Sequence, residues 1–483
     1  MATPAQSGGT ASNGAVAAPL GGDANAASYG LRRAVLSPME TLAQSISTIA
    51  PTTSPVATIP LVCALAGNGT WLAYVLATAA VLLVAWCVGR FARYSSSPGS
   101  LYSYATMILP PWLGATAAWS LLLAYVCGGA CCMGGFYQYA AVMLRDATNH
   151  FAFNVFLAAL VAIVPMWFAW RDVKISARLM LSFEAASVAL IVIVIVLVLV
   201  RHGLHPDLAQ LHLRGVKGSG FRLGLVLAVF SFTGFESATT MGAEARDPLR
   251  TIPRAVIQSA ILGGAFFIIC AYAEVLGVSM AGQNLATSDA PLHVLAGVGG
   301  LPALGLLIDI GVLVSLFAGV LACISAAARV LLLMAHNGLA HSGLRATHAR
   351  NETPGVAIVV SGLAAFIPVA VLAARGNSGL DVYGWMGSLA TYGFMVAYGL
   401  VCIALPRYLR DHHGVVNLAA RTIPVLGFIA MLLATVANLY PVPAGPYGKL
   451  PYIYLAYIAA VLLWFAFSPR ARSAASEEVS SDA

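Results

Sequence analysis

Long apolar runs alternate with short polar segments along the whole chain. Each run approaches or exceeds the roughly 20 apolar residues that a helix needs to cross the hydrocarbon core of a bilayer. The runs occupy residues 38–65, 71–90, 112–144, 151–170, 178–200, 222–245, 254–278, 302–334, 354–374, 381–405, 423–441 and 450–468. This pattern predicts an all-α membrane protein with twelve transmembrane helices.

The composition excludes a soluble globular protein. Sixty per cent of the 483 residues are hydrophobic and 9% are charged, whereas a soluble domain carries about 25% charged residues. Lipid must therefore replace water as the main solvent. The net charge of +7 is spread over short loops and forms no basic stripe, so nucleic acid is not an expected partner. All eight cysteines lie in apolar runs, where we expect small buried hydrophobes.

The distribution of Lys and Arg predicts how the chain is oriented. With the N-terminus in the cytoplasm, 18 of the 25 Lys and Arg residues fall on the cytoplasmic side and 7 on the other side. This bias, with the even number of spans, predicts a protein of the inner (cytoplasmic) membrane with both termini in the cytoplasm. We expect a disordered cytoplasmic tail at 1–30, a twelve-span domain at 31–470 and a second cytoplasmic tail at 471–483.

Two of the predicted spans contain helix breakers. Pro51, Pro55 and Pro60 lie in the first span, and a proline inside a helix costs about 3 kcal/mol. The sixth span carries Gly234 at its centre, flanked by hydroxyl side chains. Backbone left unpaired at membrane depth must line a cavity or be buried in protein, so paired breaks indicate an inverted-repeat transporter with its substrate at the breaks. Ordinary kinks are the alternative, since Pro and Gly are frequent in membrane helices.

Three regions of the chain resemble the amino acid–polyamine–organocation (APC) superfamily, and its amino acid permeases in particular. They are Phe230–Glu236 with Gly242–Ala255 behind it, Ser97–Tyr104 with the following Gly114 and Trp119, and Ala326–Gly338. The resemblance covers roughly residues 30–470. It implies a core of five plus five helices related by an inverted repeat, as in the bacterial leucine transporter, and two peripheral helices. It also implies a secondary active transporter that works by alternating access, with substrate held between spans one, three, six, eight and ten.

The two helix breaks form the expected substrate site. An α-amino acid zwitterion needs partners for both charges at membrane depth, and free backbone groups at broken helices can supply them, since no Arg or Lys lies near mid-span. The expected substrate-binding residues are Ile49, Ala50, Thr52, Thr53, Ser54, Phe230, Ser231, Thr233 and Gly234. By the resemblance Phe230 is also the aromatic gate, with ordinary packing as the alternative. Thr53-Ser54-Pro55 departs from the Gly-Ser-Gly that family members often carry there.

Four acidic residues, Glu184, Glu236, Glu274 and Asp309, lie within the predicted spans. Acids at membrane depth are costly, and they therefore indicate function. The resemblance places Glu236 first, as the proton-coupling or gate residue. The alternative for Glu236 is a structural hydrogen bond that ties the broken helix together.

The coupling ion is less clearly encoded. Ser187 stands where some proton-coupled relatives carry a lysine, and Ser325 offers one oxygen for a sodium site. Proton symport, exchange and sodium symport all stay open. Because intramembrane acids are present and no sodium cage is evident, we expect proton symport or exchange.

Transport is the function class that the sequence favours. A membrane-embedded enzyme would need a nucleophile–base pair or a metal-ligand cluster in the spans, and a sensor or channel would need a soluble domain or a pore loop. The sequence contains none of these four features, and it has no phosphate-binding loop that would point to ATP. We therefore expect no catalytic residue, metal or cofactor. The expected partners are a small-molecule substrate, a coupling proton and the lipid bilayer. Near the breaks only Glu236 could pair a second cationic group, which favours a neutral or aromatic amino acid over a polyamine or other organic amine.

Overall fold

The chain folds into a helical bundle. A computed structural model describes residues 29–144, 151–203, 205–288, 291–413, 417–440, 442 and 445–468. The regular structure of these residues is helical apart from one isolated bridge between Leu36 and Ala245, which confirms the all-α prediction. The predicted tails at 1–30 and 471–483 lie outside the described residues, except for Tyr29 and Gly30.

The longer helices form most of the bundle. They are α3 (Thr70–Phe91), α5 (Pro111–Met143), α6 (Phe151–Arg171), α7 (Val173–Arg201), α10 (Pro248–Met280), α12 (Ala303–His336), α13 (Gly355–Ala374), α14 (Gly379–His413), α15 (Leu418–Leu439) and α16 (Leu450–Phe467). The shorter helices are α1 (Pro38–Ile49), α2 (Ile59–Ala66), α4 (Leu101–Thr106), α8 (Leu208–Leu211), α9 (Gly218–Phe230) and α11 (Pro291–Val298).

Ten runs among the described residues are long and apolar enough to cross a membrane, so the chain is a multi-pass membrane protein. The first run, Pro38–Phe91, contains α1, α2 and α3 and thus both of the first two predicted spans. The sixth predicted span, 222–245, is not a single helix. Only α9 belongs to it as a regular α-helix, and α9 ends at Phe230.

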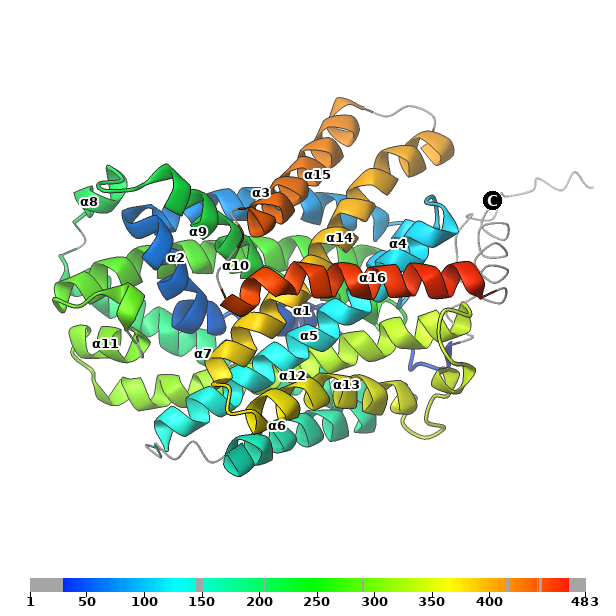
Figure 1. The fold of residues 1–483 in the computed structure, drawn as a ribbon, viewed down its shortest axis with the longest axis horizontal. Helices are drawn as coiled ribbons and strands as arrows, with labels where there is room; N and C mark the ends of the chain where they lie inside the picture. The colour runs from blue at the N-terminus through cyan, green and yellow to red at the C-terminus, as the bar shows by residue number, and fades with distance from the viewer. Residues whose placement is uncertain are drawn as a thin grey trace, which may run out of the picture.

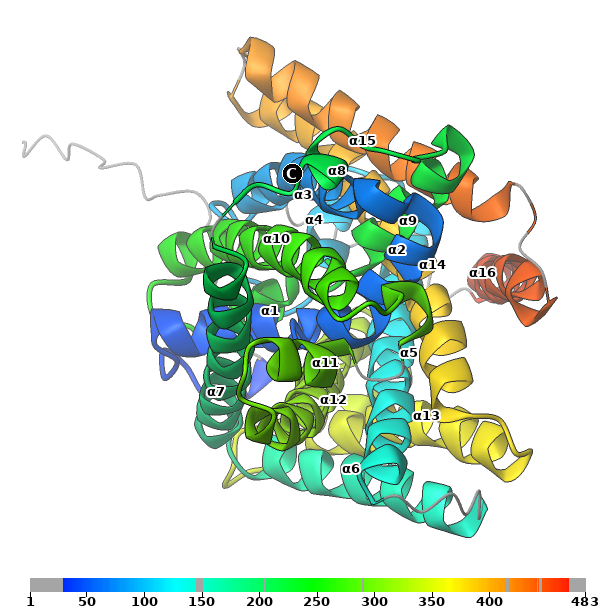
Figure 2. The same ribbon diagram turned by 90° about the vertical axis from the view of Figure 1, so that its left-hand side faces the viewer.

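The helices are arranged around α1 and α5 (Figures 1 and 2). α1 packs against α7, α10 and α12, while α5 packs against α12, α13 and α14. α15 and α16 lie at the periphery of the bundle in Figure 2, where α15 contacts α14 and α3, and α16 contacts α5 and α14. The two interrupted segments therefore lie inside the bundle, among the helices that pack most closely.

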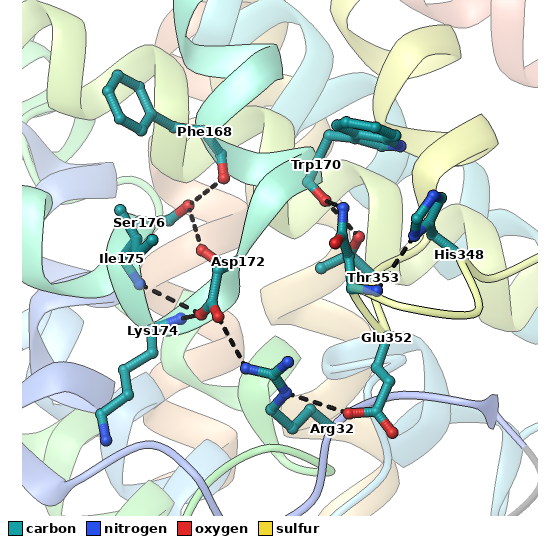
Figure 3. A network of polar contacts seen from close by, with 11 residues as sticks. Arg32, Phe168, Trp170, Asp172, Lys174, Ile175, Ser176, His348, Glu352 and Thr353 are labelled. Atoms are coloured by element: carbon teal, nitrogen blue, oxygen red, sulfur yellow. Dashed lines mark hydrogen bonds and ion pairs between the residues drawn. The ribbon is translucent and has the colours of Figure 1, made fainter.

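A polar network fastens the segment before α1 to the start of α7 (Figure 3). Arg32 donates to the Asp172 carboxylate (2.7 Å) and to the Glu352 carboxylate (3.1 Å). The hydrogen bond to Glu352 raises the pKa of the Arg32 guanidinium, against the effect of its partial burial. Asp172 also caps α7, because its carboxylate accepts the Lys174 N–H at 2.7 Å. This network joins three segments that lie far apart in the sequence.

Candidate functional site

The first predicted break is present and lies directly after α1. The helix ends at Ile49, and Ala50 adopts a left-handed conformation (φ 47°, ψ 68°) that stops it. A turn follows, in which the Thr53 N–H donates to the Ala50 carbonyl at 2.9 Å. Residues Ser54–Thr58 then form a short π-helix with Pro55 in its first turn. The prolines thus separate α1 from α2, and the prediction of a broken first span is confirmed.

The second break follows α9. Residues 231–236 form turns, and a 3₁₀-helix begins at Ser237. Gly234 has φ +90°, a conformation that side chains with a Cβ rarely adopt. Its N–H donates to the Tyr398 hydroxyl at 3.1 Å, and the Thr233 N–H donates to the Phe230 carbonyl at 3.1 Å. These two backbone donors are therefore engaged within the protein, whereas the sequence predicted free ones.

Hydroxyl groups hold the two breaks against each other. The Thr48 and Ser237 hydroxyls are 2.7 Å apart, and the Ala238 N–H donates to the Ser45 hydroxyl at 2.9 Å. Ser237 also donates to the Gln44 carbonyl at 3.1 Å. All of these groups are buried. A sliding of one break against the other must therefore replace several hydrogen bonds at once.

A cavity of about 40 Å³ lies between the breaks. It is lined by Thr48, Ile49, Ala50, Thr53, Ser54, Thr58, Gly128, Cys131, Cys132, Phe230, Ser231, Thr233, Tyr383, Gly387 and Ala390. Seven of the nine predicted substrate-binding residues are in this lining. Thr52 and Gly234 are not: Thr52 is fully buried beside the cavity, and Gly234 packs on Thr48.

Helices α5 and α14 contribute lining residues that the sequence prediction missed. Cys131 and Cys132 come from α5, and Tyr383 and Gly387 come from α14. The run of small residues from Gly128 to Cys132 was a visible signal, because small side chains let other groups approach a helix closely. The lining of the cavity holds no charged side chain. It can therefore offer hydroxyl, thiol and backbone groups to a ligand.

The aromatic ring of Phe230 lies across the cavity from α9 to α14. It packs on Tyr383 edge to face, with 6.3 Å between ring centroids. A Cβ on Gly387 would meet its ring at 2.6 Å, so this glycine makes room for the ring. Both the gate role and the packing role that the sequence predicted for Phe230 are compatible with this position. The gate role stays a prediction.

Hydrogen bonds to Glu236 connect the second break with α5 and α14. Its carboxylate accepts the Tyr125 hydroxyl of α5 at 2.8 Å and the Tyr398 hydroxyl of α14. Tyr398 in turn accepts the Gly234 N–H. These contacts match the structural alternative for Glu236, and its proton-coupling role stays a prediction.

Of the other predicted acids, two have partners and one has none. Glu184 accepts the Ser315 hydroxyl at 2.9 Å, and Asp309 forms an ion pair with His293 at 3.5 Å. Both carboxylate oxygens of Glu274 lack a hydrogen-bond partner among the described residues.

The two serines singled out for coupling also have defined positions. Ser187 donates to the Gly311 carbonyl at 2.8 Å, and the Ser325 carbonyl accepts from Arg329 at 2.9 Å. Within the described part of the chain, no group of three or more His, Cys, Asp and Glu residues could hold a metal ion.

A buried ion pair lies beyond the cavity, toward the start of α10. Arg329 of α12 donates to both oxygens of Glu244, at 2.5 and 2.8 Å, and both side chains are at most 2% exposed. Arg329 also lines a second cavity, of only about 10 Å³, together with Gln44 and Glu40. This cavity is too small to hold an amino acid.

Ser54 offers the clearest single hydrogen bond to a ligand. Its side chain is buried and lines the cavity, where its hydroxyl can reach a ligand. We expect Ser54→Ala to weaken substrate affinity only about two- to twelvefold, the equivalent of one net hydrogen bond. Binding to the purified variant in detergent checks this. Ser361→Ala is the matched control, because Ser361 is buried without a partner but lies on α13, away from the cavity. An equal loss of affinity in both variants would contradict a direct hydrogen bond between Ser54 and the substrate.

Two interrupted helices that face each other across an uncharged cavity inside a membrane bundle define the class of the protein. Interrupted helices of this kind are typical of membrane transporters. The chain belongs to the amino acid permease family, whose family model matches residues 40–477. The resemblance to the APC superfamily is thus confirmed, and the family is one of transporters.

Relatives and a solved structure agree with this membership. The chain is 31% identical to an uncharacterized transporter of Mycobacterium tuberculosis over 79% of this chain and 81% of that one. It is 26% identical to the branched-chain amino acid permease BcaP of Lactococcus lactis (74% and 81% covered), and 26% identical to the low-affinity putrescine importer PlaP of Escherichia coli (41% and 44% covered). In fold it is similar to a manganese transporter of Eremococcus coleocola, with a TM-score of 0.61, 12% identity and coverage of 92% and 95%.

Proposed function

We propose that the protein is a secondary active transporter that moves a neutral or aromatic amino acid across the cytoplasmic membrane by alternating access. The observation that carries the proposal is the uncharged cavity between the two helix breaks. Hydroxyl groups of Thr53, Ser54 and Ser231 and the ring of Phe230 suit a zwitterion with an apolar or aromatic side chain. The similarity to a branched-chain amino acid permease supports this substrate class.

A polyamine or another organic amine is the second candidate substrate. The similarity to a putrescine importer favours it. The chemistry of the cavity opposes it, because a second ammonium group needs a carboxylate and none lines the cavity. Glu236 lies nearby, but its two oxygens already accept from Tyr125 and Tyr398.

The proposed architecture has twelve spans, ten of them in a five-plus-five inverted repeat. The run Pro38–Phe91 counts as two spans, and α9 with the 3₁₀-helix Ser237–Met241 counts as one interrupted span. With the other nine runs this makes twelve. The peripheral positions of α15 and α16 suit two helices outside the repeat (Figure 2). The matching interruptions of spans one and six, five spans apart, support the repeat itself.

We further propose that both termini, including the tails at 1–30 and 471–483, lie in the cytoplasm and flank a permease domain at 31–470. The 18-to-7 division of Lys and Arg supports this orientation. A cytoplasmic reporter fused after Ala483 should be active, and a periplasmic reporter fused there should be inactive. In the loop between α7 and α9, near Pro206, the periplasmic reporter should be active and the cytoplasmic reporter inactive. Periplasmic activity of the C-terminal fusion would contradict the span count.

Coupling to protons is part of the proposal, with Glu236 as the predicted coupling residue. Uptake under an imposed proton gradient and under an imposed sodium gradient tests it. Proton-driven accumulation without sodium is expected. Strict dependence on sodium with no response to pH would overturn proton coupling.

The substrate class is tested by uptake into proteoliposomes. Purified protein is reconstituted, and labelled neutral, aromatic, acidic and basic amino acids and putrescine are offered under the same gradient. We expect uptake of neutral or aromatic amino acids, which unlabelled substrate of the same class suppresses. Uptake of putrescine alone would favour the second candidate. Protein-free liposomes are the control.

A further inference from the structure

Glu274 is a buried carboxylic acid without a partner. It lies on α10, six residues before the helix ends at Met280. Its side chain is fully buried (0% exposed), and neither carboxylate oxygen has a hydrogen-bond partner among the described residues. No described Arg, Lys or His forms an ion pair with it. Transferring an isolated ionised carboxylate into such surroundings is very costly, so the acid is stable there only in its neutral, protonated form.

The other fully buried acids of the bundle differ from Glu274 in this respect. Glu184 accepts the Ser315 hydroxyl, Glu236 accepts two tyrosine hydroxyls, and Glu244 pairs with Arg329. Each of these carboxylates has donors that offset part of the cost of its charge. Glu274 alone among them has none, so in this structure it has to carry a proton.

The groups that face Glu274 from neighbouring helices carry no positive charge. Electrostatic interactions connect it with Cys63 of α2, Tyr74 of α3, Tyr139 of α5 and Cys270 on its own helix.

Charged groups on three other elements packed on α10 pair with other residues, and Arg90 in the last turn of α3 lies over the Trp86 ring. Glu40 of α1 pairs with Arg178, Glu184 of α7 accepts from Ser315, and His293 of α11 pairs with Asp309.

A hydrogen bond connects the surroundings of Glu274 with the substrate cavity. The hydroxyl of Tyr74, one of its neighbours, is 3.0 Å from the Ser231 hydroxyl. Ser231 lines the cavity and is the first residue of the second helix break. The site lies near the opposite end of α10 from Glu244, since the helix from Pro248 to Glu274 is about 39 Å long. Tyr74 therefore links the second break, through this hydrogen bond, to the surroundings of Glu274.

We propose that Glu274 is a proton-binding site that couples proton movement to transport, in addition to the predicted role of Glu236. This inference rests on the proposed transport function. When the bundle opens and water reaches Glu274, the acid releases its proton to water and becomes a carboxylate. When the bundle closes again, the carboxylate must first take up a proton, because no other group there neutralises it. One proton is bound on closing and one is released on opening, so closure is favoured on the side of lower pH.

The test uses Glu274→Gln, which keeps the shape of the protonated acid and cannot release a proton. Reconstituted Glu274→Gln should still exchange labelled for unlabelled substrate at close to the wild-type rate. It should lose accumulation above equilibrium under an inward proton gradient. Glu184→Gln is the matched control, because Glu184 is equally buried but has a hydrogen-bond donor, and it should keep gradient-driven accumulation. Glu236→Gln, measured in parallel, tests the separate role predicted for Glu236.

Infrared spectroscopy gives a second readout that needs no substrate. The C=O band of protonated carboxylic acids in the wild-type protein at neutral pH should lose intensity in Glu274→Gln. An unchanged band would overturn the inference, and so would full proton-driven accumulation by Glu274→Gln or a purely sodium-driven accumulation that it abolishes. If wild-type liposomes take up no member of the substrate panel, the proposed function fails. The infrared result then decides separately whether Glu274 holds a proton.

Discussion

Replacing Arg329 by methionine should destabilise the protein by about 3–5 kcal/mol, because it leaves a buried carboxylate without its partner. Glu244 is fully buried and accepts two hydrogen bonds from the Arg329 guanidinium. Methionine fills a similar volume and cannot supply either bond. The expected result is a large fall in the melting temperature of the purified protein in detergent.

Two further variants separate loss of this ion pair from a general effect of removing arginine. Arg410→Met should leave the melting temperature nearly unchanged, because Arg410 is exposed and its contact with Asp411 lies at the surface. The double variant Arg329→Met with Glu244→Gln should recover stability, since no buried charge remains unpaired. A single Arg329→Met variant as stable as the wild type would show that the pair does not hold α12 to the segment before α10.

Gly234→Val should abolish substrate binding while the protein still inserts into the membrane. The backbone at Gly234 has φ +90°, and a Cβ there would lie 2.3 Å from the Thr48 side chain. Valine must therefore push the second break away from α1, which moves Ser231 and Thr233 out of the cavity wall. We expect the affinity to fall by more than about tenfold, or 1.4 kcal/mol. Binding in detergent and expression level are measured together.

Gly282→Val is the matched control for this variant. Gly282 also has a positive φ (+67°), and a Cβ there would meet no atom within 4 Å. It therefore imposes the same kind of backbone strain in a loop away from the cavity. Its substrate affinity should equal that of the wild type. Wild-type affinity in Gly234→Val would remove the second break from the substrate site.

The sequence predicted the local features of this fold well, because their causes are local. The apolar run 254–278 lies within α10, and Pro51 and Pro55 mark the interruption after α1. Gly234 was recognised as a break, and its positive φ gives the physical reason. These features depend on residues within one or two helical turns, and a single sequence displays such residues directly.

The partners of the polar groups could not be predicted in the same way. Glu236 binds Tyr125 and Tyr398, which are 111 and 162 residues away in the chain. Tyr383 packs on Phe230 at the cavity and is likewise far from it in the chain. No periodicity connects residues so far apart. For the same reason the sequence predicted a free N–H at Gly234. In the structure this N–H donates to the Tyr398 hydroxyl, which belongs to α14.

The acids within the bundle show how much the environment adds to a sequence motif. The resemblance directed attention to Glu236, whereas the chain contains nothing that distinguishes Glu274 from Glu184 before folding. Their hydrogen-bond partners distinguish them: Ser315 donates to Glu184, and no described residue donates to Glu274. Tertiary contacts therefore decide that Glu184 has a hydrogen-bond donor while Glu274 must hold a proton.

An electron cryo-microscopy map tests most directly whether the substrate binds between the two helix breaks. The map is recorded on the protein in lipid nanodiscs, with the amino acid that the uptake panel identifies. We expect ligand density bounded by Ile49–Ser54 on one side and Phe230–Thr233 on the other, with Tyr383 over its side chain. Ligand density elsewhere in the bundle, with these two segments still in direct contact, would contradict it.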